Sequence, residues 1–413
     1  MIVDVAMNMQ TIFEKRSYWH TLIAVIIGVW SIVGAVTLVF SQDWWHHIHV
    51  FTLGVLANAI IAYSTHFAQV LTHSKKKQYR SAVLKMVLVT ISIIILFVWG
   101  MQSPWSSQVI VAVIVIFGVA LWHLASLYRV WSGSKRSAKV PVLSNIVVFY
   151  MVAALFLAVA VALIMAGYLL QWNMSLVVAA HSRVALWGFA WTTIFGTSIT
   201  MIPMLTRTRY STTAQQQSLR ALGVHSGMLV ISVLVMLLSE SRLAGIGFLF
   251  VAVAGTFVMG PVLLAAVRAP NQADWDTASV GACTAIIWIL GLVFVDAIAL
   301  ICGVAPRVSF HNILPALLGV GVMQLIFSVL LFLLPAMIGR GPSAVRLGRG
   351  ISEYGGPARL VILNYGGILT LISLLNPLAL FPGMLLMALG LFGHIAVLII
   401  AACKQFTVTR KHT

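Results

Sequence analysis

Histidine is the residue type in this sequence that could take part in the widest range of chemistry. The chain has 12 histidines, and neutral imidazole is the one common side chain that both tolerates burial and binds haem iron, copper or zinc. One set precedes or opens apolar runs, and it consists of His46, His47, His49, His181 and His311. Each of these taken singly also fits an interfacial histidine bonded to its own helix. As a set on three separate runs, they favour a metal or haem site.

The elements that must position these histidines are membrane-spanning helices. Apolar residues make up 61% of the chain and charged residues 8%, so a surface of ordinary composition for water cannot be built. Apolar runs of roughly 20 to 28 residues recur, long enough to cross a hydrocarbon core of about 30 Å. We predict twelve spans, at 19–40, 46–71, 82–101, 107–131, 143–170, 175–205, 217–238, 243–267, 277–303, 308–338, 359–376 and 380–403.

The basic residues predict the orientation of these spans. Of the 25 lysines and arginines, all but Arg183, Arg242 and Arg307 lie near the N-terminus, around the loops after even-numbered spans, or in the C-terminal tail. This asymmetry places those loops and both termini in the cytoplasm. The net charge of +17 therefore reports topology and contact with lipid, and we expect no nucleic-acid partner. The polar start of the chain, without a small-residue cleavage site after the first apolar run, argues against a cleaved signal peptide.

The predicted depths reveal an internal repeat. The second, sixth and tenth spans each begin on the outer side with histidine, and these histidines are about 130 residues apart. The sequence thus predicts an all-α, polytopic membrane protein, one domain over 1–413, made of three four-helix units at about 19–131, 143–267 and 277–403. At 3.6 residues per turn, His47, Gly54, Asn58 and Ala62 share one helix face, and residues of similar type follow His181 at the same offsets.

Two ionisable residues lie inside predicted spans at similar depth. Arg183 belongs to the sixth span and Asp296 to the ninth. An ionisable group in a membrane is costly and usually faces the bundle interior. Arg183 and Asp296 could neutralise each other as a structural ion pair, or Arg183 could bind an anionic group such as a haem propionate.

The remaining histidines and the sulfur residues give weaker indications. His66, His123, His225 and His394 lie in the inner half, and His20, His73 and His412 lie near inner boundaries. The methionine pairs Met201 with Met204 and Met384 with Met387 could pass on Cu(I), because thioethers suit that ion, or could simply pack. Cys283, Cys302 and Cys403 show no C-x-x-C spacing and so predict neither a disulfide framework nor a thiolate site.

Several function classes are disfavoured. The chain has eight acidic residues, no phosphate-binding loop of Walker type, no G-x-S-x-G and no paired membrane carboxylates. These absences argue against ATP-driven pumping and hydrolase chemistry, and against a stand-alone enzyme.

Motifs in the second, sixth and tenth spans carry a family resemblance. They are H-x3-L-G-x3-N-A from His49, H-F-A from His66, H-x6-G from His181, G-T-x5-P-x3-R-T-R from Gly196, and L-L-P-x3-G-x-G-P-x2-V-R ending at Arg346. With twelve spans in three sets of four, the chain resembles subunit I of the haem-copper oxidase superfamily. It looks closest to NnrS-type proteins and to the membrane domain of actinobacterial multicopper oxidase and nitrite reductase proteins.

The resemblance implies a cofactor and a location. It implies haem, copper or both, with His49 or His47 as the second-span haem ligand, His181 as a copper ligand, and His66, Arg183 and His311 as further candidates for cofactor binding. The candidate metal ligands are His49, His181 and His311. The resemblance also implies a bacterial plasma membrane and a redox or multicopper partner protein.

The sequence departs from the oxidases at two places. The seventh span has only His225 where oxidases carry a histidine pair, and the tenth has His311 followed by Asn312 where oxidases carry H-x-H. We therefore expect no complete oxygen-reducing centre, and an auxiliary role in electron transfer, metal handling or nitric-oxide-linked protection. The alternatives are a transporter for a small solute or metal ion, for which spans broken by glycine and proline are typical, and a scaffold or assembly subunit.

Overall fold

The structure is a computed structural model that describes residues 16–40, 44–74, 78–100, 106–134, 142–268, 275–339 and 341–410. The described residues form helices and no strand. In chain order the helices are α2 (Arg16–Phe40), α3 (Trp44–His49), η1 (Val50–Ala57), α4 (Asn58–Leu71), α5 (Tyr79–Trp99), α6 (Ser107–Ser134), η2 (Val142–Asn145), α7 (Ile146–Leu169), α8 (Met174–Arg183), η3 (Val184–Trp191), α9 (Thr192–Leu205), α10 (Thr212–Leu237), α11 (Ser241–Arg268), α12 (Thr277–Ile301), α13 (Pro306–Ala316), η4 (Leu317–Met323), α14 (Gln324–Ile338), α15 (Pro342–Glu353), α16 (Gly356–Ile372), η5 (Pro377–Ala379) and α17 (Leu380–Arg410).

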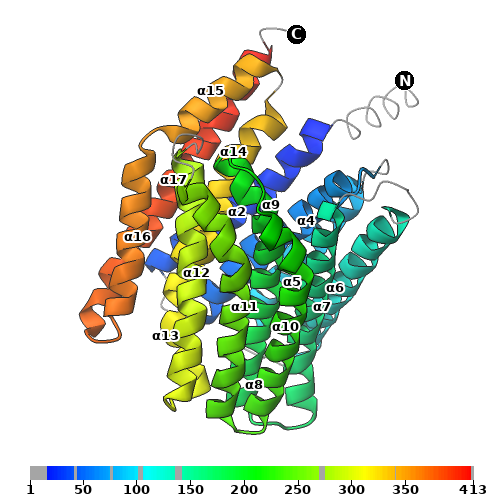
Figure 1. The fold of residues 1–413 in the computed structure, drawn as a ribbon, viewed down its shortest axis with the longest axis vertical. Coiled ribbons are helices and arrows are strands. Elements are labelled where there is room, and N and C mark those ends of the chain that lie inside the picture. Colours follow the sequence, from blue (N-terminus) through cyan, green and yellow to red (C-terminus); the bar gives the residue numbers. More distant parts are fainter. Residues whose placement is uncertain are drawn as a thin grey trace.

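The all-α, polytopic architecture predicted from the sequence is confirmed. Eleven helices within the described residues are long and apolar enough to cross a membrane, and they lie alongside one another (Figure 1). The predicted span 359–376 corresponds to α16, which has 17 residues and is shorter than the others. The count of twelve spans and the three-unit organisation stay predictions.

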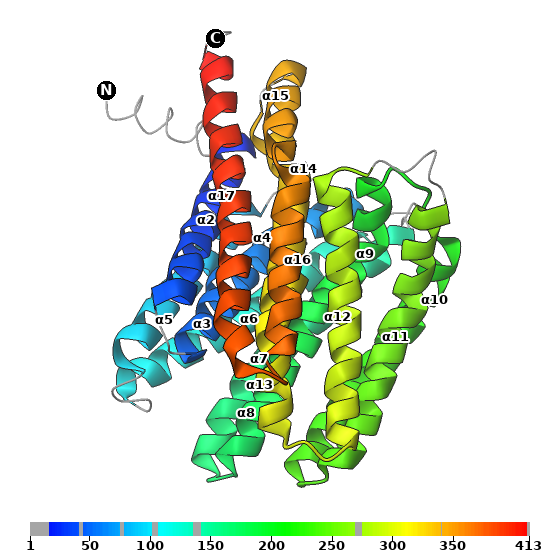
Figure 2. The ribbon, with the colours of Figure 1, turned by 90° about the vertical axis from the view of Figure 1, so that its left-hand side faces the viewer.

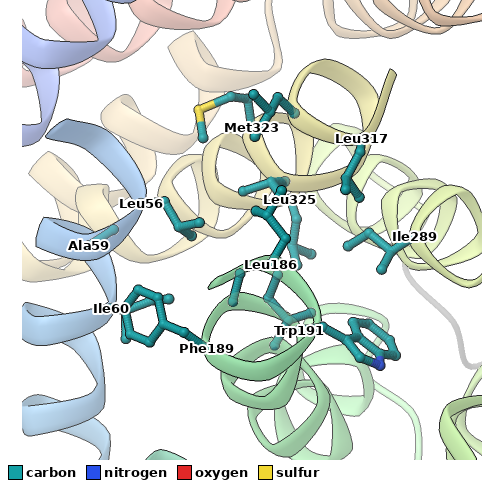
Figure 3. Close-up of a cluster of buried hydrophobic side chains, with 14 of the residues drawn as sticks. Leu56, Ala59, Ile60, Leu186, Phe189, Trp191, Ile289, Leu317, Met323 and Leu325 are labelled. Atoms are coloured by element: carbon teal, nitrogen blue, oxygen red, sulfur yellow. The ribbon is translucent and has the colours of Figure 1, made fainter. Parts of the chain in front are cut away.

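Three continuous spans form the core of the bundle. They are Trp44–Leu71, Met174–Leu205 and Pro306–Ile338, and in their most apolar windows 72%, 83% and 78% of the residues are buried. The other long helices bury 39% to 56% in the corresponding windows, because one side of each faces lipid. We call these three the core spans, and they are the second, sixth and tenth spans of the sequence. Figure 3 shows their apolar side chains meeting, among them Leu56, Phe189 and Leu325.

Each core span changes from α-helix to π-helix in its middle. The π segments are η1, η3 and η4, and each contains at least one glycine. π-helix is rare and concentrates at functional sites. The uniform 3.6-residue period assumed from the sequence is therefore wrong within these segments, and the predicted common face of His47, Gly54, Asn58 and Ala62 does not continue through η1.

A bulky side chain from a neighbouring helix packs against one glycine in each π segment. A Cβ at Gly54 would lie 2.8 Å from the Trp30 ring of α2, and a Cβ at Gly188 would lie 2.7 Å from the Phe156 ring of α7. At Gly319 the added atom would meet the Met387 sulfur of α17. The glycines thus set how closely the outer helices approach the core spans.

The remaining long helices surround the core spans. The α10, α11 and α12 helices pack in sequence, as do α5, α6 and α7, and α16 packs along α17 (Figure 2). The first long helix, α2, also contacts the last, α17. Following the predicted orientation, we call the end of the bundle at which Trp44, Met174 and Pro306 lie the outer end.

Helix α15 was not expected from the sequence, which showed only a basic cluster at 346–349. Its buried residues are Ala344, Gly348 and Ser352, four residues apart and so on one face. Gln405 of α17 donates hydrogen bonds to the carbonyls of Pro335 and Ala344, at 2.9 and 3.0 Å. The helix lies at the end opposite the outer end (Figure 1).

We predict that Gly188→Ala lowers the free energy of unfolding by about 1–3 kcal/mol, because the new methyl group overpacks against Phe156. The matched control is Gly223→Ala in α10, where a Cβ meets no atom within 4 Å and alanine improves helix propensity. Thermal unfolding in detergent compares the two variants. Equal stability of both variants would contradict the close contact at Gly188.

Candidate functional site

Two of the outer histidines, from different core spans, contact the same tryptophan. The Trp44 ring lies 5.7 Å from the His47 ring and 5.2 Å from the His311 ring, edge-on in both cases. His47 is buried, with Nε2 placed 2.7 Å from the Thr37 carbonyl of α2. His311 is exposed. The outer ends of the second and tenth spans therefore bring two imidazoles to one place.

His49 and His46 lie against aromatic rings on the other side of α3. The His49 ring is tilted over Trp45 at 4.4 Å, and its Nδ1 lies 2.8 Å from the Trp45 carbonyl. His46 packs edge-on against Phe97 at 4.9 Å. These contacts hold both rings at the boundary between α3 and α5.

His181 of the sixth span turns towards α7. Its Nδ1 lies 2.7 Å from the Ala160 carbonyl. Because a carbonyl only accepts, Nδ1 carries the proton in this bond and the lone pair of the neutral ring lies on Nε2. This is the tautomer that a metal-binding histidine adopts when its second nitrogen is fixed by the protein.

The structure confirms the ion pair between Arg183 and Asp296. Arg183 Nη2 and Nε donate to the two Asp296 carboxylate oxygens at 2.6 and 2.9 Å, and Nη1 donates to the Ala179 carbonyl at 3.1 Å. Both side chains are fully buried. Trp187 and Ser309 also donate to Asp296, at 3.2 and 2.8 Å. The pair thus joins the sixth, ninth and tenth spans, and its guanidinium donors bind groups of the protein.

The inner-half histidines are spread over separate contacts. His66, a predicted cofactor-binding residue, packs edge-on against His20 at 5.1 Å, and His20 also contacts Tyr79. His225 Nε2 lies 3.0 Å from Thr192 Oγ1 and 3.1 Å from the Trp187 carbonyl. His225 thus contacts the π segment of the sixth span through the Trp187 carbonyl.

One polar cluster was missed by the sequence analysis, which counted Lys85 among the basic residues of the inner boundary. Lys85 is fully buried, donates to Ser126 Oγ at 2.8 Å and lies 4.9 Å from the Trp122 ring centre. It forms no ion pair within the part of the chain that the structure describes. In the same region His123 Nε2 lies 2.9 Å from Ser64 Oγ. The only sequence signal was that Lys85 lies three residues inside the predicted span 82–101.

Two cavities lie along the core spans. The inner one, of about 90 Å³, is lined mainly by α4, α9 and α14 and is apolar apart from hydroxyl groups such as those of Tyr63, Ser64 and Thr197. The outer one, of about 20 Å³, lies between α3, η4 and α17. His47 lines the outer cavity together with Met323, Met384 and Met387.

The predicted ligands His49, His181 and His311 do not form a closed metal centre with other histidines, cysteines or carboxylates. Within the described residues, no group of three or more His, Cys, Asp or Glu side chains is placed to bind one metal ion. A scan against protein-family models and a search of curated proteins find no match for the chain.

We predict that Arg183→Met lowers the free energy of unfolding by about 3–5 kcal/mol, because it leaves the Asp296 carboxylate buried and uncompensated. The double variant Arg183→Met/Asp296→Asn removes that charge and keeps an acceptor for Trp187 and Ser309, so we expect it to regain most of the loss. Denaturant titration in detergent measures both variants. A double variant less stable than the single one would contradict this account.

Proposed function

We propose that this membrane protein binds haem or copper through histidines at the outer ends of its core spans, and that it serves electron transfer, metal handling or nitric-oxide-linked protection. The observation that carries the proposal is the approach of His47 and His311, from two core spans, to the same Trp44 ring. Haem iron takes one or two axial ligands from the protein, and copper accepts imidazole readily.

The hydrogen bonds of these histidines support the proposal. His47 and His181 each place one ring nitrogen against a backbone carbonyl of a neighbouring helix, Thr37 and Ala160 respectively. Such contacts fix the tautomer and the ring orientation, and metal-binding histidines generally have them. For a histidine that only packed in the interior, the same bonds would simply satisfy a polar atom, so metal content decides between the two interpretations.

The proposed role stops short of oxygen reduction. The seventh span, which carries a histidine pair in the oxidases, has only His225 here, and this side chain is fully buried with Nε2 near the Trp187 carbonyl and the Thr192 hydroxyl. A single histidine cannot replace the pair of ligands that the oxidases have on this span. The proposal therefore keeps the relation to haem-copper oxidase subunit I, in a bacterial plasma membrane with cytoplasmic termini, without a complete oxygen-reducing centre.

A transporter is the second candidate, and the inner cavity is the observation that favours it. This cavity of about 90 Å³ lies between all three core spans. None of the described residues that line it is acidic, so the coupling of transport to protons or sodium would need another group. The cavity-lining Ser64 is bonded to His123, and the fully buried Lys85 lies in the same region, bonded to Ser126.

The test is an optical spectrum and metal analysis of the detergent-purified protein, oxidised and reduced. We expect a Soret band or stoichiometric copper, reduced at least severalfold in His47→Phe, His181→Phe and His311→Phe. The matched control is His394→Phe, because His394 is buried in α17, stacks on Phe327 at 6.1 Å, and has no hydrogen-bond partner within the described residues.

Two results would count against the proposal. A folded protein without haem or metal after expression with both supplied would remove it and favour the transporter. Equal loss of metal in the His394→Phe control would mean that the outer histidines are not the specific ligands.

A further inference from the structure

We infer that the outer cavity is a binding site for one Cu(I) ion, with the thioethers of Met323, Met384 and Met387 and the imidazole of His47 as ligands. The inference rests on the proposed function and makes it specific, because it selects copper over haem and names the ligand set. Of these residues, the sequence suggested His47 as a haem ligand and the pair Met384 and Met387 for Cu(I), with no link between them. The structure brings them to one cavity and adds Met323.

The four side chains converge from three separate segments of the chain. Met384 and Met387 are three residues apart in α17 and so lie on one helix face. Met323 is the last residue of η4, and His47 belongs to α3. All four line the same cavity, and all but the half-buried Met384 are buried. Residues distant in sequence thus bring three thioether side chains and one imidazole ring around one small volume.

The π segment of the tenth span makes room for one of these sulfurs. The Met387 sulfur packs directly against Gly319, where any Cβ would collide with it. Gly319 also lines the cavity. A larger residue at this position would displace the thioether, so the glycine and the π segment that contains it position Met387.

The donor set fits Cu(I) better than the other common metal ions. Thioethers are soft, neutral ligands that select Cu(I), whereas Zn²⁺ is bound by thiolate, imidazole and carboxylate. None of the described residues around this cavity is acidic or a cysteine. With neutral ligands the bound ion keeps its full charge, and burial of a divalent ion in an apolar environment is far more costly than burial of a monovalent one.

The size of the cavity agrees with an ion and disagrees with a macrocycle. Its volume is about 20 Å³, close to the room that a single water molecule requires. Pockets for organic cofactors measure roughly 300–1,000 Å³. The geometry therefore points to a bare metal ion beside His47, and a haem would require the core spans to separate from α17.

The experiment measures Cu(I) affinity of the full-length protein in detergent, by anaerobic titration against a chromophoric Cu(I) chelator. We expect one Cu(I) per chain. The variants Met323→Leu, Met384→Leu and Met387→Leu should each weaken binding by at least the roughly 10- to 100-fold seen when a supporting residue of a metal site is lost. Met86→Leu and Met259→Leu are matched controls, since both methionines are fully buried in other helices, α5 and α11.

A second measurement keeps the result independent of copper redox chemistry. Ag(I), a redox-inert analogue of Cu(I), should raise the unfolding temperature of the unmodified protein, since a ligand that binds only the folded state stabilises it. This shift should disappear in Met384→Leu/Met387→Leu, and Zn²⁺ at the same concentration should not reproduce it.

The outcomes separate this inference from the proposed function. If the three Leu variants bind Cu(I) as tightly as the controls do, the thioether site is wrong. If haem or copper is then still lost in the histidine variants, the proposed function stands without it. A protein that binds neither haem nor copper nor Ag(I) overturns both.

Discussion

A backbone in lipid has to satisfy its own polar groups, because the hydrocarbon offers no water to replace a missing hydrogen bond. The three core spans meet this requirement while departing from α-helix in their middles, and buried polar side chains take part. Asn58 donates to the Gly54 carbonyl at 2.8 Å, and His225 approaches the Trp187 carbonyl of η3. In the tenth span Gln324 donates across to Gly281 and Thr284 of α12.

Each core span carries a polar residue at the same place relative to its π segment. Asn58, Thr192 and Gln324 are the first residues after η1, η3 and η4, and all three are fully buried. The glycine in each π segment admits a bulky side chain from an outer helix, and the residues before the segment carry the outer histidines. The position of the candidate site therefore follows from the π segments in the three core spans, and in each span a buried polar residue stands at the point where α-helix resumes.

Much of the fold could be predicted because hydropathy reports the solvent of each stretch. The predicted run 175–205 corresponds to Met174–Leu205, and 308–338 to Pro306–Ile338. Similar depth also made Arg183 and Asp296 a possible pair. The lateral packing of the helices could not be predicted from the sequence, because hydropathy does not say which helices are neighbours. The sequence therefore could not show that Met323 and Met384 line one cavity, or that α6 covers Lys85. The π segments also depart from the 3.6-residue period from which the helix face of His47 was predicted.

The outer and inner cavities are both lined by the second and tenth spans, and the π segments of these spans contribute to the lining. Phe51 lines the outer cavity and Leu56 the inner one, and in the tenth span Gly319 and Leu325 do the same. In an α-helix one residue corresponds to a rotation of about 100° about the axis. A π-helix has more residues per turn, so each of its residues rotates less about the axis. The segments η1 and η4 therefore set the rotation of the inner half of each span relative to its outer half. Through this rotation the two π segments determine which side chains of each span face the outer cavity and which face the inner one.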